Sequence, residues 1–399
     1  SRGITTEGGL RNAFFRDEPG ASLSLAAGLA GREPDYDAFI DAYLVEADDY
    51  REQLREYVTR ATGQAPTGDS VALAAFRSLS LAEQRVLLQQ ILFAELRAGG
   101  RLAAQAGPTN NDFTRAFEAL ETYFPGANPD LETGESNPYE GDVRLVFSRV
   151  YTLAGGDVSL LVPGGAVDVG LAAPPDSFGV AKDAAELGIV VQSVGDVASL
   201  SYADFQVNES RVFAGDGGDI LVWSTRGDID AGRGAKTAIS APPPVITIDE
   251  QGQPSIAFPA AFAGSGIQTL ATSIGREPGD VDLFAPRGVV NAGDAGIVAG
   301  NLTIAATAVL GANNITVSGT AVGVPVETGG LGAAIAGASA AGSSATTSAT
   351  ADLAASEEQS SETPLADSAI RFLEVFVTGL GEDQCRPDDL ECLRRQPQR

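Results

Sequence analysis

Residues 217–230 read Gly-Gly-Asp-Ile-Leu-Val-Trp-Ser-Thr-Arg-Gly-Asp-Ile-Asp, and the predicted fold rests on the pattern in this stretch. It holds two copies of one pattern, a Gly-Asp pair followed by an apolar residue, which begin at Gly218 and Gly227. Glycine adopts the left-handed conformations of tight corners, aspartate accepts hydrogen bonds from turn amides, and the β-branched residue that follows favours a strand. The pattern therefore predicts short strands that start directly after sharp corners.

The same pattern recurs from residue 139 to about residue 328. Its separations, among them 15, 23 and 9 residues, are irregular, so we expect the copies to mark more than one corner of a coil. A single coil cannot bury its apolar face, and stacked coils supply the core. We predict a mainly β fold, a right-handed parallel β-helix (solenoid). The clearest copies begin at Gly141, Gly156, Gly195, Gly218, Gly227 and Gly279, with relaxed copies at Gly300 and Asn313.

Residues 34–125 have a different texture, with apolar residues at spacings of three and four, the period of an amphipathic helix. Ser80-Leu-Ala-Glu83 reads as a capping box that starts one helix, and we expect Gly99-Gly100 to end it. This segment is predicted to be a small α-helical subdomain inserted into the β fold.

The C-terminal part of the chain divides further. Residues 329–365 are rich in Ala, Gly, Ser and Thr and are expected to form a low-complexity linker. The apolar run that follows predicts a terminal β-strand that either folds back onto the coils or adds to a partner's sheet. The predicted domains are residues 1–33 (partial β-helix coils), 34–125 (helical insertion), 126–328 (β-helix), 329–365 (linker), 366–384 (terminal strand) and 385–399 (C-terminal tail with a cysteine pair).

Cysteine content, net charge and hydropathy restrict the compartment and the partners that we expect for this chain. The pair Cys385 and Cys392 suits a small disulfide loop in an oxidising compartment, although two unpaired thiols would give the same sequence. The net charge of −27 repels phosphate backbones, so we expect no nucleic-acid partner. The apolar stretches are shorter than the ~20 residues of a transmembrane helix, so none is expected. The chain begins at Ser1 and contains no Met, and we expect it to be a piece of a longer precursor.

A set of longer motifs carries a family resemblance. The motifs are Ser210–Phe213, Gly217–Ser224, Gly227–Thr237, Ala241–Pro244, Gly279–Gly288, Asn291–Ile297 and Gly300–Leu302, with Leu96–Gly99 and Thr122–Gly126 in the helical segment. Together they resemble the C-terminal portion of filamentous haemagglutinin family outer-membrane proteins, the cargo half of two-partner secretion. The resemblance spans nearly the whole chain, and the run from residue 210 to residue 244 is its most specific part.

The resemblance implies a function. It implies export through an outer-membrane partner pore, an elongated rod, and a place at the cell surface of a Gram-negative bacterium or in its surroundings. The N-terminal domain that such a pore reads is missing here, so we do not expect this chain to be exported alone. The expected role is a stalk or adhesin segment in attachment, aggregation or filament building. Expected partners are glycans or proteins on host or neighbouring cells, and further copies of the chain.

Arg226-Gly227-Asp228 is a candidate adhesion motif, because host integrins read this tripeptide. Yet Gly227-Asp228-Ile229 is also a copy of the corner pattern, and every Gly-Asp pair here has the same predicted turn role. We therefore interpret the three residues as structural and keep adhesion as the alternative.

Calcium is a second candidate. The run from Gly215 to Ile220 partly resembles the Gly/Asp calcium turn of secreted β-rolls, with Asp216 and Asp219 as ligands. That turn needs consecutive nine-residue copies, and none follow. We predict no cofactor and no metal, with calcium at these two residues as the alternative.

Enzyme activity is the alternative from a different class. β-Helical polysaccharide lyases and glycosidases need convergent carboxylates, often with Lys or Arg, on one face of stacked strands. Corner aspartates explain the acidic residues here better, so we predict no enzyme. A third possibility, the stalk of a contact-dependent toxin, is disfavoured because the tail from Cys385 is too short for a toxin domain. The catalytic candidates are Asp228, Asp230, Arg233 and Lys236, in a chain without histidine.

Two segments are the expected recognition sites. Pro242-Pro-Pro244 is predicted to begin a loop that projects from a coil and runs to about Ala263, and loops of this kind usually carry recognition. The helical insertion is the other. Trp223 lies at an alternating position and is interpreted as a core residue rather than a ligand platform.

Overall fold

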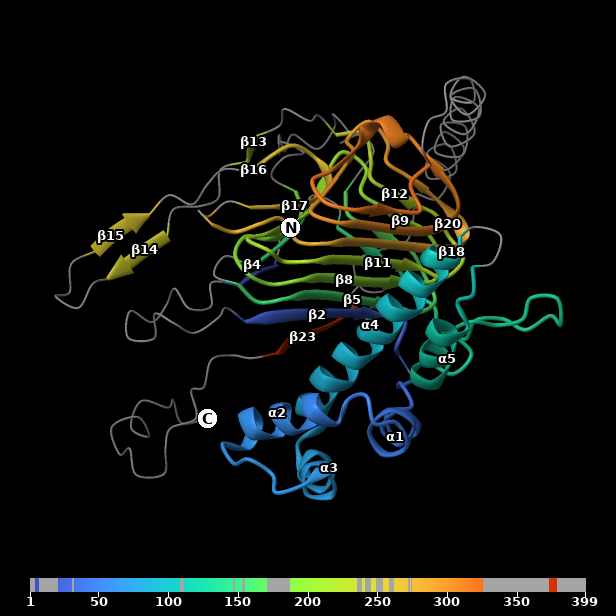
Figure 1. Cartoon of the computed structure of the whole chain (residues 1–399), viewed down its shortest axis with the longest axis vertical. Coiled ribbons are helices and arrows are strands. Elements are labelled where there is room, and N and C mark those ends of the chain that lie inside the picture. The colour runs from blue at the N-terminus through green and yellow to red at the C-terminus, as the bar shows by residue number, and fades with distance from the viewer. Residues whose placement is uncertain are drawn as a thin grey trace, which may run out of the picture.

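The computed structural model is mainly parallel β, with sheets that nearly close on one another in a barrel-like shape and a few helices beside them (Figure 1). The mainly β, parallel character of the prediction is confirmed. The structure describes residues 4–6, 21–30, 32–107, 111–145, 148–152, 155–170, 187–234, 239–240, 245–248, 254–257, 262–271, 273, 275–325 and 373–378.

The strands form three parallel ladders. Each time the chain winds once around the interior, which we call a pass, it adds strands to these ladders in turn. Strands that are neighbours in space therefore come from successive passes. The central ladder holds β2 (Ser22–Ala27), β5 (Val158–Val162), β8 (Val197–Ser201), β11 (Ile220–Ser224), β18 (Val281–Asn291), β20 (Leu302–Leu310) and β22 (Ala321–Val322).

The other two ladders flank the interior. The seven-stranded ladder holds β1 (Ile4–Thr6), β4 (Arg149–Thr152), β7 (Gly188–Val191), β10 (Arg211–Gly215), β17 (Gly266–Leu270), β19 (Ile297–Ala299) and β21 (Ile315–Val317). The short-strand ladder holds β3 (Val143–Arg144), β6 (Val167–Asp168), β9 (Phe205–Gln206) and β12 (Ile229–Asp230), and the second halves of β18 and β20 continue it. A 3₁₀ turn, Ala312–Asn314, precedes β21.

The central ladder is buried on both faces. Ile220 and Val222 of β11 belong to the interior cluster between the ladders, whereas Leu221 and Trp223 belong to a second cluster on the outer face. All four side chains are fully buried. This explains why β11 is a continuous apolar run, as expected for a strand that is covered on both sides.

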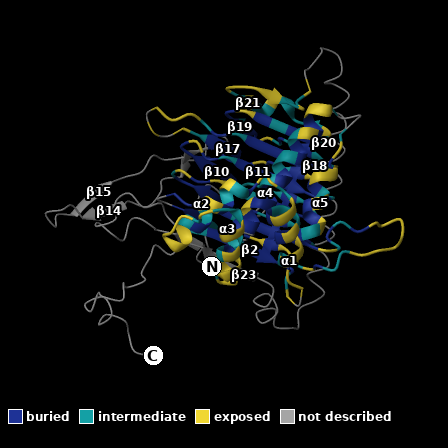
Figure 2. Cartoon of the chain, turned by 60° about the horizontal axis from the view of Figure 1, so that its bottom comes forward, coloured by how far each residue is buried: buried dark blue, intermediate teal, exposed yellow. Residues whose placement is uncertain are grey.

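The helices cover that outer face. They are α1 (Tyr36–Ile40) with the π-helical turn η1 (Asp41–Glu46), α2 (Arg51–Thr62), α3 (Asp69–Ser78), α4 (Leu81–Ala106) and α5 (Thr114–Tyr123). Helix α4 crosses the strands of the central ladder (Figure 1) and contacts β11, β18 and β20. Figure 2 shows the strands mostly buried and exposed residues gathered on the helices and loops. No helix among the described residues is long and apolar enough to cross a membrane.

Helix α4 begins as predicted and ends later than predicted. The Ser80 side chain accepts from the amide of Glu83, and the Glu83 side chain accepts from the amide of Ser80 in return. The predicted stop at Gly99-Gly100 is wrong, because the helix continues to Ala106. A methyl carbon on Gly100 would lie 2.3 Å from the Phe284 ring, and one on Gly99 would lie 2.7 Å from Cβ of Ala116. The two glycines allow close packing instead of ending the helix.

The remaining strands are antiparallel. β23 (Leu373–Thr378) pairs with β2, so the structure shows the first of the two alternatives for the terminal strand. β13 (Ile239–Ser240) pairs with β16 (Phe262–Ala263), and β14 (Val245–Ile248) pairs with β15 (Pro254–Ala257) within the predicted projecting loop. The predicted linker (329–365), Cys385, Cys392 and Lys236 lie outside the described residues.

Candidate functional site

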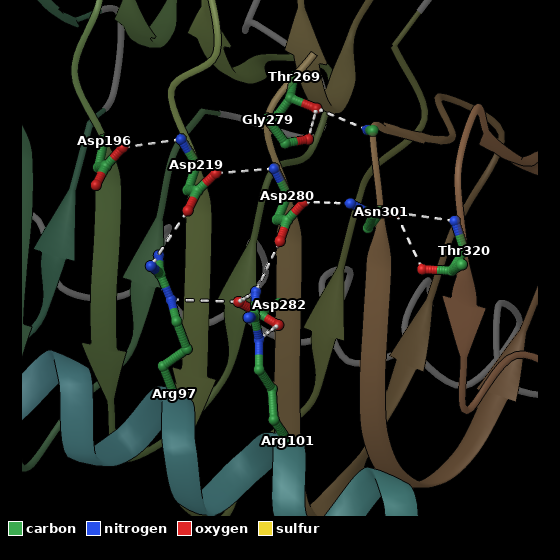
Figure 3. A network of polar contacts seen from close by, with 11 residues as sticks. Arg97, Arg101, Asp196, Asp219, Thr269, Gly279, Asp280, Asp282, Asn301 and Thr320 are labelled. Atoms are coloured by element: carbon green, nitrogen blue, oxygen red, sulfur yellow. Dashed lines mark hydrogen bonds and ion pairs between the residues drawn. The ribbon is translucent and has the colours of Figure 1, made fainter. Parts of the chain in front are cut away.

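One corner of the stack carries a column of polar side chains at the starts of the central-ladder strands (Figure 3). Each side chain except the last accepts a hydrogen bond from the equivalent residue of the next pass. Oδ1 of Asp196 accepts from the amide of Asp219 at 2.9 Å, and Oδ1 of Asp219 accepts from the amide of Asp280 at 2.8 Å. The complete column, the first corner column, is Ser22, Asp157, Asp196, Asp219, Asp280, Asn301 and Thr320.

A second corner column lies at the starts of the short-strand ladder. Oδ1 of Asp142 accepts from the amide of Ala166, and Oδ1 of Asp204 accepts from the amide of Asp228. Oδ1 of Asp228 in turn accepts from the amide of Val289 at 2.7 Å. The prediction that copies of the Gly-Asp pattern mark more than one corner is thus confirmed.

The candidate adhesion motif lies in this second corner column. The Arg226 guanidinium donates to the carbonyl of Pro129 at 2.6 Å, and Asp228 is the corner acceptor just described. A methyl carbon on Gly227 would lie 2.3 Å from the backbone of Ala203, so a neighbouring pass requires glycine here. All three residues therefore have structural partners, and their reading as an integrin motif stays a hypothesis.

The structure does not bring the two calcium candidates into one site. The Asp216 carboxylate accepts from the amide and the hydroxyl of Ser273, at 2.8 and 2.7 Å. The Asp219 carboxylate accepts from the amide of Asp280 and from Arg97. Within the described ranges, no group of three or more His, Cys, Asp or Glu side chains is placed to hold a metal ion.

Two further catalytic candidates, Asp230 and Arg233, also make contacts within the stack. Asp230 Oδ1 accepts from the amide of Gly232 at 2.7 Å, and its Oδ2 accepts from the side-chain amide of Asn291 at 3.2 Å. Arg233 is exposed and donates its backbone amide to the carbonyl of Asn208. The carboxylate of Asp230, like that of Asp228, thus bonds to neighbouring parts of the stack.

Sequence reasoning missed a cluster where α4 meets the first corner column (Figure 3). Arg97 and Arg101 lie one helical turn apart, so both reach the same strands. Arg101 donates Nε and Nη2 to the two oxygens of Asp282, each at 2.9 Å, and Arg97 Nε lies 3.2 Å from Asp282 Oδ2. The two arginines also pair with Asp219 and Asp280, at 3.2 and 3.0 Å. We call these five residues the arginine clamp.

The clamp is a closed set of contacts. The Asp282 side chain has no exposed surface, and its bidentate pairing raises the pKa of Arg101. All six carboxylate oxygens of Asp219, Asp280 and Asp282 accept a hydrogen bond. The carboxylates therefore hold α4 on the strands and join neighbouring passes to each other.

The aromatic core beside the clamp includes Trp223. Its ring is fully buried and packs edge-to-face against Phe113, Phe117 and Phe284, with centroids 5.8, 5.6 and 6.2 Å away. The indole N–H donates to Thr225 Oγ1 at 3.1 Å. Trp223 is thus a core residue of the helix–strand interface, as interpreted from the sequence.

Comparison with known proteins gives one match, to a family model that covers part of the strand region. No curated protein and no solved structure matches the chain. One family model matches residues 217–326, which run from just before β11 to just beyond β22. The resemblance seen in the sequence is confirmed over this segment, which matches a family described as filamentous haemagglutinin family outer membrane protein.

Proposed function

We propose that this chain is a non-enzymatic segment of a bacterial surface adhesin, and that its passes wind as a right-handed parallel β-helix. It works at the surface of a Gram-negative cell, after export through an outer-membrane partner pore, by presenting recognition elements to glycans or proteins of other cells. The family match over residues 217–326 is the observation that carries this proposal.

The contacts of the polar residues support a scaffold role. The corner aspartates bond to the next pass, and the carboxylates of the arginine clamp are all engaged. A β-helical enzyme needs carboxylates that are directed at a substrate. The winding direction follows the strong preference of parallel strands for right-handed connections.

Two elements are proposed to carry recognition. The first is the segment with the β14–β15 hairpin, whose two strands pair with each other and with no other described strand. The second is the outward side of the helices, because their other side is committed to the central ladder. Surface elements on a rigid scaffold are the usual places for binding.

Attachment of protein-coated beads tests the proposal. Beads carrying the purified chain should attach to mammalian or bacterial cell layers above the level of albumin-coated beads. Replacing residues 243–260 by a Gly/Ser segment of equal length should reduce attachment if the hairpin carries recognition. The exposed substitution Thr316→Ala on β21, outside both proposed recognition elements, is the control.

Two results would overturn the proposal. If beads with the chain attach no better than albumin beads to every cell type tested, the adhesin role is wrong. Release of reducing ends from acidic polysaccharides by the purified chain would show instead that it is a carbohydrate-active enzyme.

A further inference from the structure

Strand β23 differs from the other strands of the three ladders. Every other described pair in these ladders is parallel, whereas β23 pairs with β2 in an antiparallel register over six residues. Successive passes of one winding chain give parallel neighbours, so β23 is not a further pass. It is an added strand that occupies the free edge of β2.

The register shows which part of the stack β23 closes. Val377, Val375 and Leu373 pair with Leu23, Leu25 and Ala27 of β2. These three residues of β2 belong to the interior cluster and are at most 1% exposed. Without β23, the backbone edge of β2 would be open beside the end of the interior. An open strand edge is a template for pairing with another chain.

The connection to β23 is long. The order of the strands places β22 seven steps from β23, which is about 34 Å at the usual strand spacing. Residues 323–372 provide 50 residues between them, with an extended reach of roughly 165 Å. This length reaches β2 of the same copy and β2 of an adjacent copy equally.

We propose that β23 is a donor strand that exchanges between two copies of this chain. Each copy places residues 373–378 on β2 of the other, in the same antiparallel register. The exchange replaces every hydrogen bond of the β2–β23 pair by an identical one, so pairing in cis and in trans differs mainly in chain entropy and concentration. Two copies that lie side by side in opposite directions would bring each β22 close to the β2 end of its partner, which is the arrangement that needs the shortest connection.

Engineered disulfides distinguish the two arrangements. In all variants Cys385 and Cys392 are changed to Ser, and one chain carries Ser24→Cys while another carries Phe376→Cys. These positions are Cα partners in the register, and directly opposed antiparallel residues lie within disulfide range. A chain with both cysteines should cross-link within itself at any dilution, which tests the β2–β23 pair.

Mixing the two single-cysteine chains tests the exchange. We expect a disulfide-linked heterodimer whose yield rises with protein concentration. A mixture of Ser24→Cys with Ser344→Cys, which lies in the long connection, reports random collisions. The proposal is overturned if the double variant fails to cross-link, or if the mixed chains give no more heterodimer than this control.

Shortening the connection gives an independent test in the same full-length background. Deleting residues 326–370 leaves five residues between β22 and β23, and their reach of roughly 18 Å falls well short of the distance of about 34 Å between the two strands. The shortened chain should sediment as a dimer, whereas the parent sediments as a monomer at the same low concentration. A shortened chain that stays monomeric contradicts the exchange.

Discussion

Gly100 shows how a single residue sets the distance between helix and strands. Alanine normally stabilises an exposed helix by about 1 kcal/mol relative to glycine. Here its methyl group would meet the buried Phe284 ring at 2.3 Å. We therefore expect Gly100→Ala to lower the free energy of unfolding by about 1–3 kcal/mol, as overpacking usually does. Urea unfolding measures the change, and Gln90→Ala on the exposed side of α4 should have little effect.

Asp282 is expected to be the most sensitive acidic residue. It is fully buried and paired with two arginines. Asp282→Asn should cost about 2–3 kcal/mol of unfolding free energy, somewhat less than for a fully buried pair because both guanidinium groups keep partial contact with water. The same substitution at Asp41, whose pair with Arg77 is exposed, should cost less than about 1 kcal/mol. Equal costs at the two positions would argue against the arginine clamp.

Asp228 tests the structural reading of the Arg-Gly-Asp motif. Asp228→Ala removes the acceptor for the amide of Val289 and should cost about 1 kcal/mol. Asp228→Asn keeps an oxygen in that position and should come close to the parent in thermal unfolding. Asp228→Glu should leave cell attachment unchanged, and a loss of integrin-dependent attachment in that variant would support the adhesion motif instead.

At the scale of elements, Glu95 ties the helices of the insert together. It accepts bonds from Arg115 at 2.6 and 2.8 Å and from the hydroxyl of Tyr50. Burial alone would raise its pKa, but the hydrogen bonds from Arg115 and Tyr50 outweigh burial and lower the pKa below the ordinary 4.5. A lowered carboxyl pKa stabilises the fold fully above pH 4.5, and this stabilisation is lost as the pH falls through the folded-state pKa.

The pH dependence of thermal unfolding tests this role of Glu95. The melting temperature of Glu95→Gln should lie well below that of the parent at pH 7, and the gap should narrow toward pH 3. Circular dichroism melts over this pH range measure it. Glu56→Gln, at an exposed position of α2, is the control and should melt like the parent throughout. A gap that is as wide at pH 3 as at pH 7 would contradict the role given to Glu95.

The same scale shows what could be predicted from the sequence. The Ser80 cap was predictable because its hydrogen bonds join residues three positions apart. The Gly-Asp corners were predictable because the pair recurs along the sequence, although their hydrogen bonds join residues 23 or 61 positions apart. The continuation of α4 through Gly99 was not predictable, because glycine is required there by the close approach of Ala116 on another helix and not by a helix end. The arginine clamp joins residues 181 positions apart, and an Arg pair one turn apart on an apolar helix was its only sequence signal.

At the scale of the whole molecule, the helices and the passes are one body. The helical insert enters the chain in the first pass, between β2 and β3, yet α4 reaches β20 in a late pass. Each pass is stabilised by hydrogen bonds to its neighbours in the ladders, and α4 packs against several passes at once. The segment from the long connection then returns as β23 to the first pass. Local opening of α4 should therefore uncover the outer faces of several strands together.

Hydrogen exchange with increasing denaturant shows whether the helices and the strands they cover open together. We predict that the amides of the middle of α4 and those of β8 and β11 become exposed in one shared opening, with the same free energy and the same dependence on denaturant. Arg101→Met, which removes the bidentate contact to Asp282, should lower protection in both groups equally. Exchange of the α4 amides at much lower denaturant, with the strands still protected, would contradict the claim that the helical insert and the stack form one structural unit.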